Sequence, residues 1–314
     1  MKNIKTAVIG VGNMGRHHAR VYSEISDLVA VSEINEKIGR GIADEYGVPL
    51  YKDYKKMLRD EMIDAVSIAV PTSLHTTIAI DCLNKKLATF VEKPLAKTEK
   101  EAKDIIAASK RNNVLLAVGH IERYNPAITK LKKMVDVGEL GEILCMLAVR
   151  VGIAPPSQQG SDVVSDLAIH DIDIFNYLLG ETPIKTKIVK SQLIKNNLSD
   201  TAAIVLEYKN ATGMIQTNWV TPIKVRKLYV TGSKQYIELD YIKQKIISYK
   251  RSLGKRYNGS FNQFEASYKP VEKKIFFSKK EPLREELLNF IMCIKSNKLM
   301  DTSYALDAVK IVAV

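Results

Sequence analysis

The chain has 314 residues, of which 46% are hydrophobic and 26% charged, and its formal net charge at pH 7 is +12. This composition is that of a folded globular protein and excludes a disordered, collagen-like or disulfide-stapled chain. The length favours two domains. No run reaches about 18 consecutive apolar residues, so we expect no membrane segment and a cytoplasmic protein.

Three cysteines, Cys82, Cys145 and Cys293, lie far apart in the sequence. Their odd number does not suggest a disulfide framework, and no second type of metal ligand lies at a short spacing from them. We therefore expect buried free thiols and no metal site.

The excess of positive charge is concentrated between Lys250 and Lys280, where nine basic residues stand against two acidic ones. Tyr257, Phe261, Phe264 and Tyr268 lie among polar residues of this stretch, but no nucleic-acid-binding motif accompanies the cluster. We expect an exposed loop, or a rim that attracts a phosphate-bearing substrate, and no nucleic-acid partner.

The first third of the chain alternates short β-branched runs with helical segments, which indicates a doubly wound parallel sheet of the Rossmann type. The last of these helices follows a capping box, Thr98-x-x-Glu101. We expect strands at Thr6–Gly10, Leu28–Glu33, Ala65–Val70, Ala88–Glu92 and Val114–Gly119, and helices at Asn13–Ile25, Asn35–Tyr46, Ser73–Asn84 and Lys100–Asn112.

After Gly119 the pattern changes to that of an α+β domain. Between Lys185 and Tyr249 short strand-like segments alternate with turns, which favours an open, mainly antiparallel sheet in meander order. The terminal segment, Leu283–Val314, returns to helical spacing. We expect helices at Pro126–Val137 and Val163–Leu179, a bend at Pro155-Pro156, and strands at Ile143–Val151, Lys185–Leu193, Ala202–Tyr208, Gly213–Trp219, Val225–Val230, Tyr236–Leu239 and Lys245–Ser248.

A glycine-rich loop, Gly10-Val11-Gly12-Asn13-Met14-Gly15, directly follows the first strand and opens the first helix. In a dinucleotide fingerprint the first glycine permits the tight turn, the second lets the backbone approach a pyrophosphate, and the third allows close packing of helix on strand. The helix N-terminus adds free N–H donors and a positive dipole end. We expect dinucleotide binding here, rather than a merely structural turn.

Glu33 follows the loop at the end of the second strand. A carboxylate there accepts both ribose hydroxyls and repels a 2′-phosphate. Ser32 could tolerate a phosphate, but Ile34-Asn35-Glu36-Lys37 offers only one basic residue to hold it. We expect NAD to be preferred over NADP.

Two further segments end strands of the parallel sheet and so lie at its carboxyl edge, where ligands bind. Pro71 and Thr72 end the third long strand, and we expect them at the nicotinamide end of the cofactor. His75 nearby is assigned to the cofactor site, in a packing rather than a catalytic role. Glu92-Lys93-Pro94 ends the fourth strand and places an ammonium at the same edge.

Asp166, His170 and Asp173 are spaced as one face of a helix. A carboxylate one turn from an imidazole orients the ring and raises its basicity, as a general base for alcohol oxidation requires. The alternative is an acidic helix start with a half-buried histidine. A metal site is a poorer interpretation, because no further ligands converge in the sequence.

The segment Gly119–Pro126 lies at the expected domain junction, where Arg123 and Tyr124 could contact substrate or fix the hinge. His17 and His18, inside the first helix, are expected to pack or to face solvent.

Three signatures in order, the Gly10–Gly15 loop, Glu92-Lys93-Pro94 and Asp166-x-x-x-His170, make the chain resemble the glucose–fructose oxidoreductase / inositol dehydrogenase / rhizopine-catabolism (Gfo/Idh/MocA) family over essentially its whole length. Members oxidise or reduce a secondary carbinol of a sugar or cyclitol with NAD(P). The resemblance implies that Lys93, Asp166 and His170 are catalytic and contact substrate. Members often carry a Gly pair before the aspartate, and this chain has Gly160-Ser161-Asp162 instead.

Within the family, Gly119–Pro126 and the compact length look most similar to dehydrogenases acting at the 3-position of UDP-N-acetylglucosamine and its uronic acid. Free inositol is the alternative substrate, and a dinucleotide sensor or structural subunit without turnover is the alternative outside enzymes. We expect a Rossmann domain over 1–122, a substrate and oligomerisation domain over 123–282, and C-terminal helices over 283–314 that pack back on the Rossmann domain. An open antiparallel sheet usually has one face covered. We expect another subunit to cover it here, in a homodimer or homotetramer.

Overall fold

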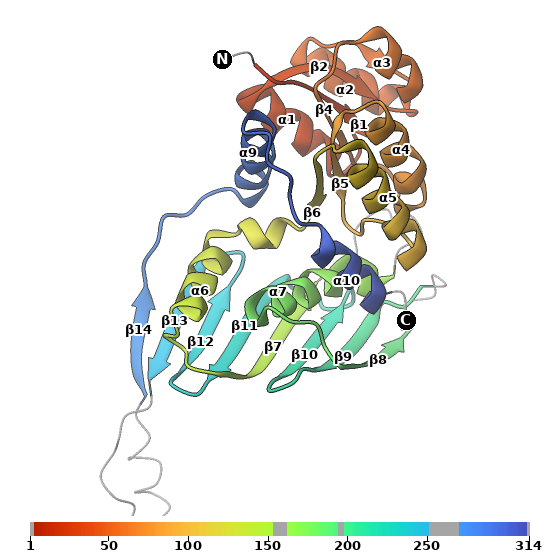
Figure 1. The fold of residues 1–314 in the computed structure, drawn as a ribbon. Helices are drawn as coiled ribbons and strands as arrows, with labels where there is room; N and C mark the ends of the chain where they lie inside the picture. The colour runs from red at the N-terminus through yellow and green to blue at the C-terminus, as the bar shows by residue number, and fades with distance from the viewer. Residues whose placement is uncertain (1–2, 153–161, 194–197, 251–269, 313–314) are drawn as a thin grey trace, which may run out of the picture. The chain divides into compact units, whose positions relative to one another are not determined.

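The computed structural model describes residues 3–152, 162–193, 198–250 and 270–312 (Figure 1). The chain divides into two compact units, Met1–Tyr124 with Glu281–Val314, and Asn125–Lys280. The sequence placed these divisions at 122/123 and 282/283. The bend at Pro155-Pro156 and most of the basic segment lie outside the described residues.

The first unit contains a six-stranded parallel sheet of order β3-β2-β1-β4-β5-β6. The sheet is buried on both faces, which is why its strands are almost continuously apolar. Its strands are β1 Lys5–Ile9, β2 Asp27–Ser32, β3 Leu50–Tyr51, β4 Ala65–Ile68, β5 Ala88–Glu92 and β6 Leu116–Gly119. Its helices are α1 Gly15–Ile25, α2 Glu36–Tyr46, α3 Tyr54–Asp60, α4 Thr72–Asn84 and α5 Glu99–Asn112, followed by a 3-10 turn at Ile121–Tyr124.

Local signals account for several of these helix ends. The side chain of Asn35 caps α2, and the expected capping box of Thr98 and Glu101 begins α5. Asn113 ends α5 in the left-handed conformation. The sequence did not indicate β3 and α3, because a two-residue strand and a seven-residue helix are too short to show a period.

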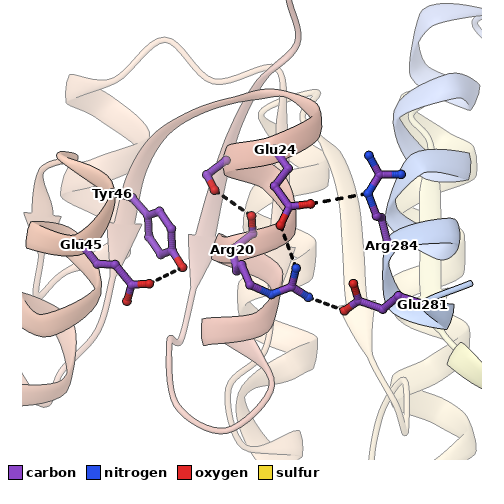
Figure 2. A network of polar contacts seen from close by, with 7 residues as sticks. Arg20, Glu24, Glu45, Tyr46, Glu281 and Arg284 are labelled. Atoms are coloured by element: carbon purple, nitrogen blue, oxygen red, sulfur yellow. Dashed lines mark hydrogen bonds and ion pairs between the residues drawn. The ribbon is translucent and has the colours of Figure 1, made fainter.

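Two C-terminal helices, α9 Pro282–Lys295 and α10 Ser303–Val312, belong to this first unit. Phe290 of α9 joins the core cluster of Val8 on one face of the sheet, and Val309 of α10 joins that of Ile9 on the other. The start of α9 is also tied to α1 at the surface. Figure 2 shows Arg20 between Glu24 and Glu281, and Arg284 beside Glu24.

The second unit contains an eight-stranded sheet of order β14-β13-β12-β11-β7-β10-β9-β8. Figure 1 shows α6 and α7 together on one face of this sheet. Its strands are β7 Ile143–Val151, β8 Lys185–Ser191, β9 Thr201–Glu207, β10 Thr212–Asn218, β11 Val225–Gly232, β12 Gln235–Asp240, β13 Lys245–Lys250 and β14 Val271–Ile275. Its helices are α6 Pro126–Asp136, a π-helical turn at Val164–Ala168, and α7 Ile169–Leu179. The expected fold class, a doubly wound sheet plus an α+β unit, is confirmed.

Three expectations for this unit need correction. The sheet is not a simple meander, because β7 lies between β11 and β10 and pairs with β10 in parallel. The basic segment is not all loop, because β14 continues the sheet next to β13. The helix expected over Val163–Leu179 begins with the π-helical turn, which holds Asp166.

None of the helices in the described ranges is long and apolar enough to cross a membrane. Cys82 and Cys293 are buried free thiols, as expected, whereas the free thiol of Cys145 in β7 is only half-buried. Among the described residues no group of three His, Cys, Asp or Glu side chains is arranged to hold a metal ion.

Candidate active site

The glycine-rich loop lies at the carboxyl end of β1, next to the point where β1 pairs with β2 on one side and β4 on the other. Gly10 has φ +82°, and a Cβ there would lie 2.7 Å from Val70 Cγ1. A Cβ on Gly15 would lie 1.8 Å from the Gly10 carbonyl oxygen, whereas a Cβ on Gly12 would meet nothing within 4 Å. The loop therefore packs tightly against the strands and leaves open space in front of Gly12.

Glu33 directly follows β2 and turns its carboxylate toward this loop. Its Oε2 accepts a hydrogen bond from the Val11 amide at 3.0 Å, and its Oε1 accepts one from the Asn35 amide at 3.0 Å. These two bonds fix a half-buried negative charge beside the glycine-rich loop. Ser32, considered as a phosphate ligand, is buried within β2.

His75 lies in the first turn of α4, just after Pro71 and Thr72, and is 1% exposed. Its Nε2 lies 2.9 Å from the Val70 carbonyl oxygen, and its Nδ1 lies 2.9 Å from the Pro94 carbonyl oxygen. Burial lowers the pKa of this imidazole, although the two carbonyl oxygens act in the opposite direction. The ring thus joins the two loops that follow β4 and β5.

Glu92 ends β5, and Lys93 follows it at the same edge of the sheet as Gly10. Glu92 Oε2 accepts a hydrogen bond from the Lys93 amide at 3.1 Å, and Oε1 lies 2.9 Å from His18 Nε2. Burial by itself raises the pKa of the Glu92 carboxyl, but the hydrogen bond and charge of His18 and the charge of Lys93 lower it overall. The Glu92 side chain therefore turns into the protein and holds the backbone of Lys93.

Asp166 and His170 lie in the second unit, at the junction of the π-helical turn with α7, and both are half-buried. Trp219 Nε1 donates a hydrogen bond to Asp166 Oδ2 at 3.2 Å. Asp171, the neighbour of His170, is buried and pairs with Arg150 of β7. Asp173, the third member of the expected helix face, is 2% exposed. π-Helical turns within longer helices often occur at functional sites.

Arg123 and Tyr124 lie in the 3-10 turn at the end of the first unit. The Arg123 guanidinium stacks 3.8 Å from the centroid of the Tyr304 ring, and Asn289 Nδ2 donates to the Tyr124 hydroxyl at 3.0 Å. Burial raises the pKa of Tyr124 to about 12. Both side chains hold the C-terminal helices, which favours the hinge interpretation over substrate contact.

The structure thus gathers the proposed cofactor residues at one sheet edge, because Gly10, Glu33, Pro71 and Lys93 each follow a parallel strand. Asp166 and His170 belong to the other unit. The sequence did not indicate two buried pairs, His18 with Glu92 next to Lys93 and Arg150 with Asp171 next to His170. A signal existed for each, since His18 lies one turn from buried Tyr22, and Arg150 follows buried Met146 and Ala148 at the period of a strand.

Two family models cover most of the chain. The one described as "Oxidoreductase family, NAD-binding Rossmann fold" matches residues 4–120, and the one described as "GFO/IDH/MocA C-terminal domain" matches residues 128–238. The chain belongs to the Gfo/Idh/MocA family. The predictions of an oxidoreductase and of NAD as its dinucleotide are confirmed.

Several characterised dehydrogenases are similar in sequence to this chain. UDP-N-acetylglucosamine 3-dehydrogenase from Acidithiobacillus ferrooxidans is 29% identical over 255 residues, which are 81% of this chain and 79% of that protein. Myo-inositol 2-dehydrogenase from Thermotoga maritima is 27% identical over 309 residues, 94% and 89% of the two chains. This family member is therefore a dehydrogenase of the sugar-oxidising kind.

Two solved structures share the fold of this chain. That of the Acidithiobacillus ferrooxidans enzyme aligns with a TM-score of 0.86 at 24% identity, over 99% of this chain and 96% of that one. Levoglucosan dehydrogenase, in complex with NADH and levoglucosan, aligns with a TM-score of 0.84 at 20% identity, over 99% and 95%.

The residues at the carboxyl edge fit an NAD cofactor. The open space before Gly12 leaves the backbone accessible to a pyrophosphate. The helix α1 begins at the end of this loop, so its positive dipole end lies there. No side chain caps this N-terminus, where Met14 precedes the first turn, so its backbone N–H groups remain available to an anion. The carboxylate of Glu33 lies at the end of β2, where a ribose diol is bound in dinucleotide-binding folds.

Proposed function

We propose that this protein oxidises a secondary ring hydroxyl of a sugar to a ketone with NAD. We propose further that the substrate is UDP-N-acetylglucosamine or a related UDP-amino sugar, and that the group oxidised is its 3-hydroxyl. One observation carries the proposal. Lys93 lies at the carboxyl edge of the parallel sheet, on the edge that also holds the glycine-rich loop and Glu33. An ammonium that projects from this edge would lie where the reacting end of a dinucleotide is bound.

Three side chains divide the chemistry of alcohol oxidation. NAD, held by the Gly10–Gly15 loop and Glu33, would supply the two-electron acceptor for the hydride of the substrate C–H bond. His170 takes the hydroxyl proton, Asp166 orients the imidazole, and Lys93 stabilises the developing negative oxygen. The alternative division has Lys93 itself take the proton. Trp219 supports the Asp166 assignment, because its indole N–H fixes one carboxylate oxygen.

The choice of a UDP-amino sugar rests on the similar dehydrogenase from Acidithiobacillus ferrooxidans and on the basic character of this chain. Lys250, Lys273, Lys274, Lys279 and Lys280 belong to the described part of the basic segment. Myo-inositol is the alternative substrate, supported by the similarity to the Thermotoga maritima enzyme. Exposed lysines that attract a diphosphate are screened by salt over about 10 Å at 0.1 M.

The test follows the absorbance of NADH when the protein is mixed with NAD and either UDP-N-acetylglucosamine or myo-inositol. We expect turnover of the nucleotide sugar with a KM that rises with salt. Lys93→Ala and His170→Ala should lower kcat by roughly 10²- to 10⁴-fold and leave the NAD affinity within a few-fold. Turnover of myo-inositol alone would transfer the assignment to the alternative substrate. NAD binding without turnover of any alcohol would indicate a dinucleotide sensor.

We also propose that the second unit forms a homodimer or homotetramer through the face of the eight-stranded sheet opposite α6 and α7. Leu147, Met214 and Val205 are neighbours on that face across β7, β10 and β9. Met214 and Val205 are 39% and 43% exposed, which is high for apolar residues in the middle of a large sheet. Light scattering should give an assembly for the wild type and monomers for Met214→Lys/Val205→Lys; monomers in both would disprove the proposal.

A further inference from the structure

Four buried polar side chains form a continuous chain that ends at the backbone of Lys93. The Tyr22 hydroxyl lies 2.7 Å from Ser67 Oγ, and Ser67 Oγ lies 3.1 Å from His18 Nδ1. His18 Nε2 lies 2.9 Å from Glu92 Oε1, and the Lys93 amide donates to Glu92 Oε2. The chain connects α1, β4 and β5, three elements that are distant in sequence.

This polar chain is shielded from water. Tyr22, His18 and Ser67 are 0% exposed and Glu92 is 8% exposed. The Phe90 ring contacts the His18 imidazole edge-on, with centroids 5.3 Å apart. A buried carboxylate without donors is costly, so the geometry of Glu92 depends on the donors that reach it.

The space around Glu92 is equally restricted. A Cβ on Gly119 would lie 3.0 Å from Glu92 Oε2, so a larger residue in β6 would displace the carboxylate. Glycine in β6 therefore leaves the carboxylate room on one side, and His18 fixes it on the other. In this position the carboxylate contacts both His18 Nε2 and the Lys93 amide.

We propose that His18 is a positioning residue for Lys93: the imidazole fixes the Glu92 carboxylate, and this carboxylate fixes the backbone from which the Lys93 ammonium projects. The inference rests on the role given to Lys93 in the proposed function. His18 lies in the first turns of α1, the helix whose N-terminus faces the glycine-rich loop. The His18 imidazole thus connects α1, whose N-terminus is expected to hold the pyrophosphate, with the end of β5, where Lys93 is proposed to contact the substrate.

Loss of the contact between His18 and Glu92 should change the position of Lys93 and not the affinity for NAD. A catalytic group displaced by about 1 Å can lose roughly 10²-fold in rate, because the reacting atoms no longer approach correctly. Loss of the His18 hydrogen bond should therefore lower kcat and leave cofactor binding almost unchanged.

The test compares His18→Leu with His18→Gln and with His17→Leu, which alters the exposed neighbour on the same helix. Leucine removes the donor to Glu92, whereas a glutamine amide can still donate. Three quantities are measured for each: kcat, the Kd for NAD, and the hydrogen-exchange rate of the Lys93 backbone amide. We expect His18→Leu to lower kcat roughly 10- to 100-fold, to speed exchange at Lys93, and to leave the Kd within a few-fold. His18→Gln should restore part of kcat and part of the protection of the Lys93 amide from exchange. His17→Leu should match the wild type in all three quantities.

Unchanged kcat and unchanged exchange in His18→Leu would overturn the proposal, as would a His18→Gln variant no better than His18→Leu. If His18→Leu does not fold, Ser67→Ala removes only the hydroxyl that fixes the imidazole. It should then speed exchange at Lys93 by a smaller factor, and no change would again disprove the proposal. Failure of the proposed function is separate: full turnover in Lys93→Ala would remove Lys93 from catalysis, while the exchange rates would still decide whether His18 orders its backbone.

Discussion

Arg150 of β7 and Asp171 of α7 form a two-point ion pair inside the second unit. Arg150 Nε lies 2.6 Å from Asp171 Oδ2, and its Nη2 lies 3.1 Å from Oδ1. The two side chains are 4% and 1% exposed. The Tyr241 hydroxyl donates to Asp171 at 3.3 Å, and the Tyr241 ring lies 4.8 Å from the Arg150 guanidinium. The pair fixes α7 on the sheet one residue away from His170.

Removal of one partner of this pair should be strongly destabilising. Arg150→Met or Asp171→Leu leaves an uncompensated buried charge, which costs about 3–5 kcal/mol in the free energy of unfolding. The double variant should cost less than the worse single variant, because no charge remains buried. Urea unfolding measures all three. The control is the exposed Lys56–Asp60 pair, 62% and 41% exposed, where alanine substitutions should cost less than about 1 kcal/mol. Additive losses at Arg150 and Asp171 would contradict the expectation.

Two glycines of the glycine-rich loop should differ in what their substitution changes: Gly12 should affect cofactor binding, and Gly15 should affect stability. Gly12→Ala places its methyl group in open space, so the free energy of unfolding should stay within about 1 kcal/mol of the wild type. Its NAD affinity should fall at least roughly tenfold, because the methyl group occupies the path of the pyrophosphate. Gly15→Ala forces a Cβ against the Gly10 carbonyl oxygen and should cost about 1–3 kcal/mol or more. Calorimetry and urea unfolding check both variants. Normal NAD affinity in Gly12→Ala would show that the pyrophosphate binds elsewhere.

Glu33 should select NAD over NADP. Its carboxylate is fixed by the Val11 and Asn35 amides, and a 2′-phosphate at the same place would meet a negative charge. Comparison of kcat/KM for the two cofactors should show a clear NAD preference in the wild type and its erosion in Glu33→Ala. Glu36→Ala is the matched control, since Glu36 lies on the same segment but pairs with Arg40 and Lys52. Equal or better use of NADP by the wild type would assign the phosphate to Ser32 and Lys37.

Glu92 should make the stability of the protein sensitive to acid. Burial is the largest single effect and raises the pKa of this carboxyl, but the hydrogen bond and charge of His18 and the charge and backbone amide of Lys93 together lower it below its ordinary value of 4.5. A group of this kind stabilises the folded state above its unfolded pKa and loses that contribution as the pH falls. Glu92→Gln should therefore be less stable than the wild type at neutral pH, and the difference should shrink as the pH falls below 4.5 and through the lowered pKa of Glu92. Urea unfolding at several pH values measures it. A constant difference across this range would show that folding does not perturb Glu92.

The sequence by itself determined the local structure and the identity of the chemistry-bearing segments. The Gly10–Gly15 loop, the capping box of Thr98 and Glu101, and the run Ile143–Val151 form the expected local structures. These features depend on a few consecutive residues, so backbone preference and hydrophobic period are enough to indicate them. The strand ends then place Glu33 and Lys93 at one edge of the parallel sheet, as the strand pattern predicts.

Only the tertiary structure decided which distant side chains meet. His18 and Glu92 are separated by 74 positions, and Arg150 and Asp171 by 21. Their pairing depends on strand order and register, including the insertion of β7 between β11 and β10. A local pattern shows that a residue is buried, but it does not identify the partner of a buried charge. For this reason the sequence indicated Lys93 and His170 as candidate catalytic residues. Only the fold showed that His18 and Glu92 hold the backbone of Lys93. Likewise, only the fold showed that Arg150 and Asp171 hold the helix of His170.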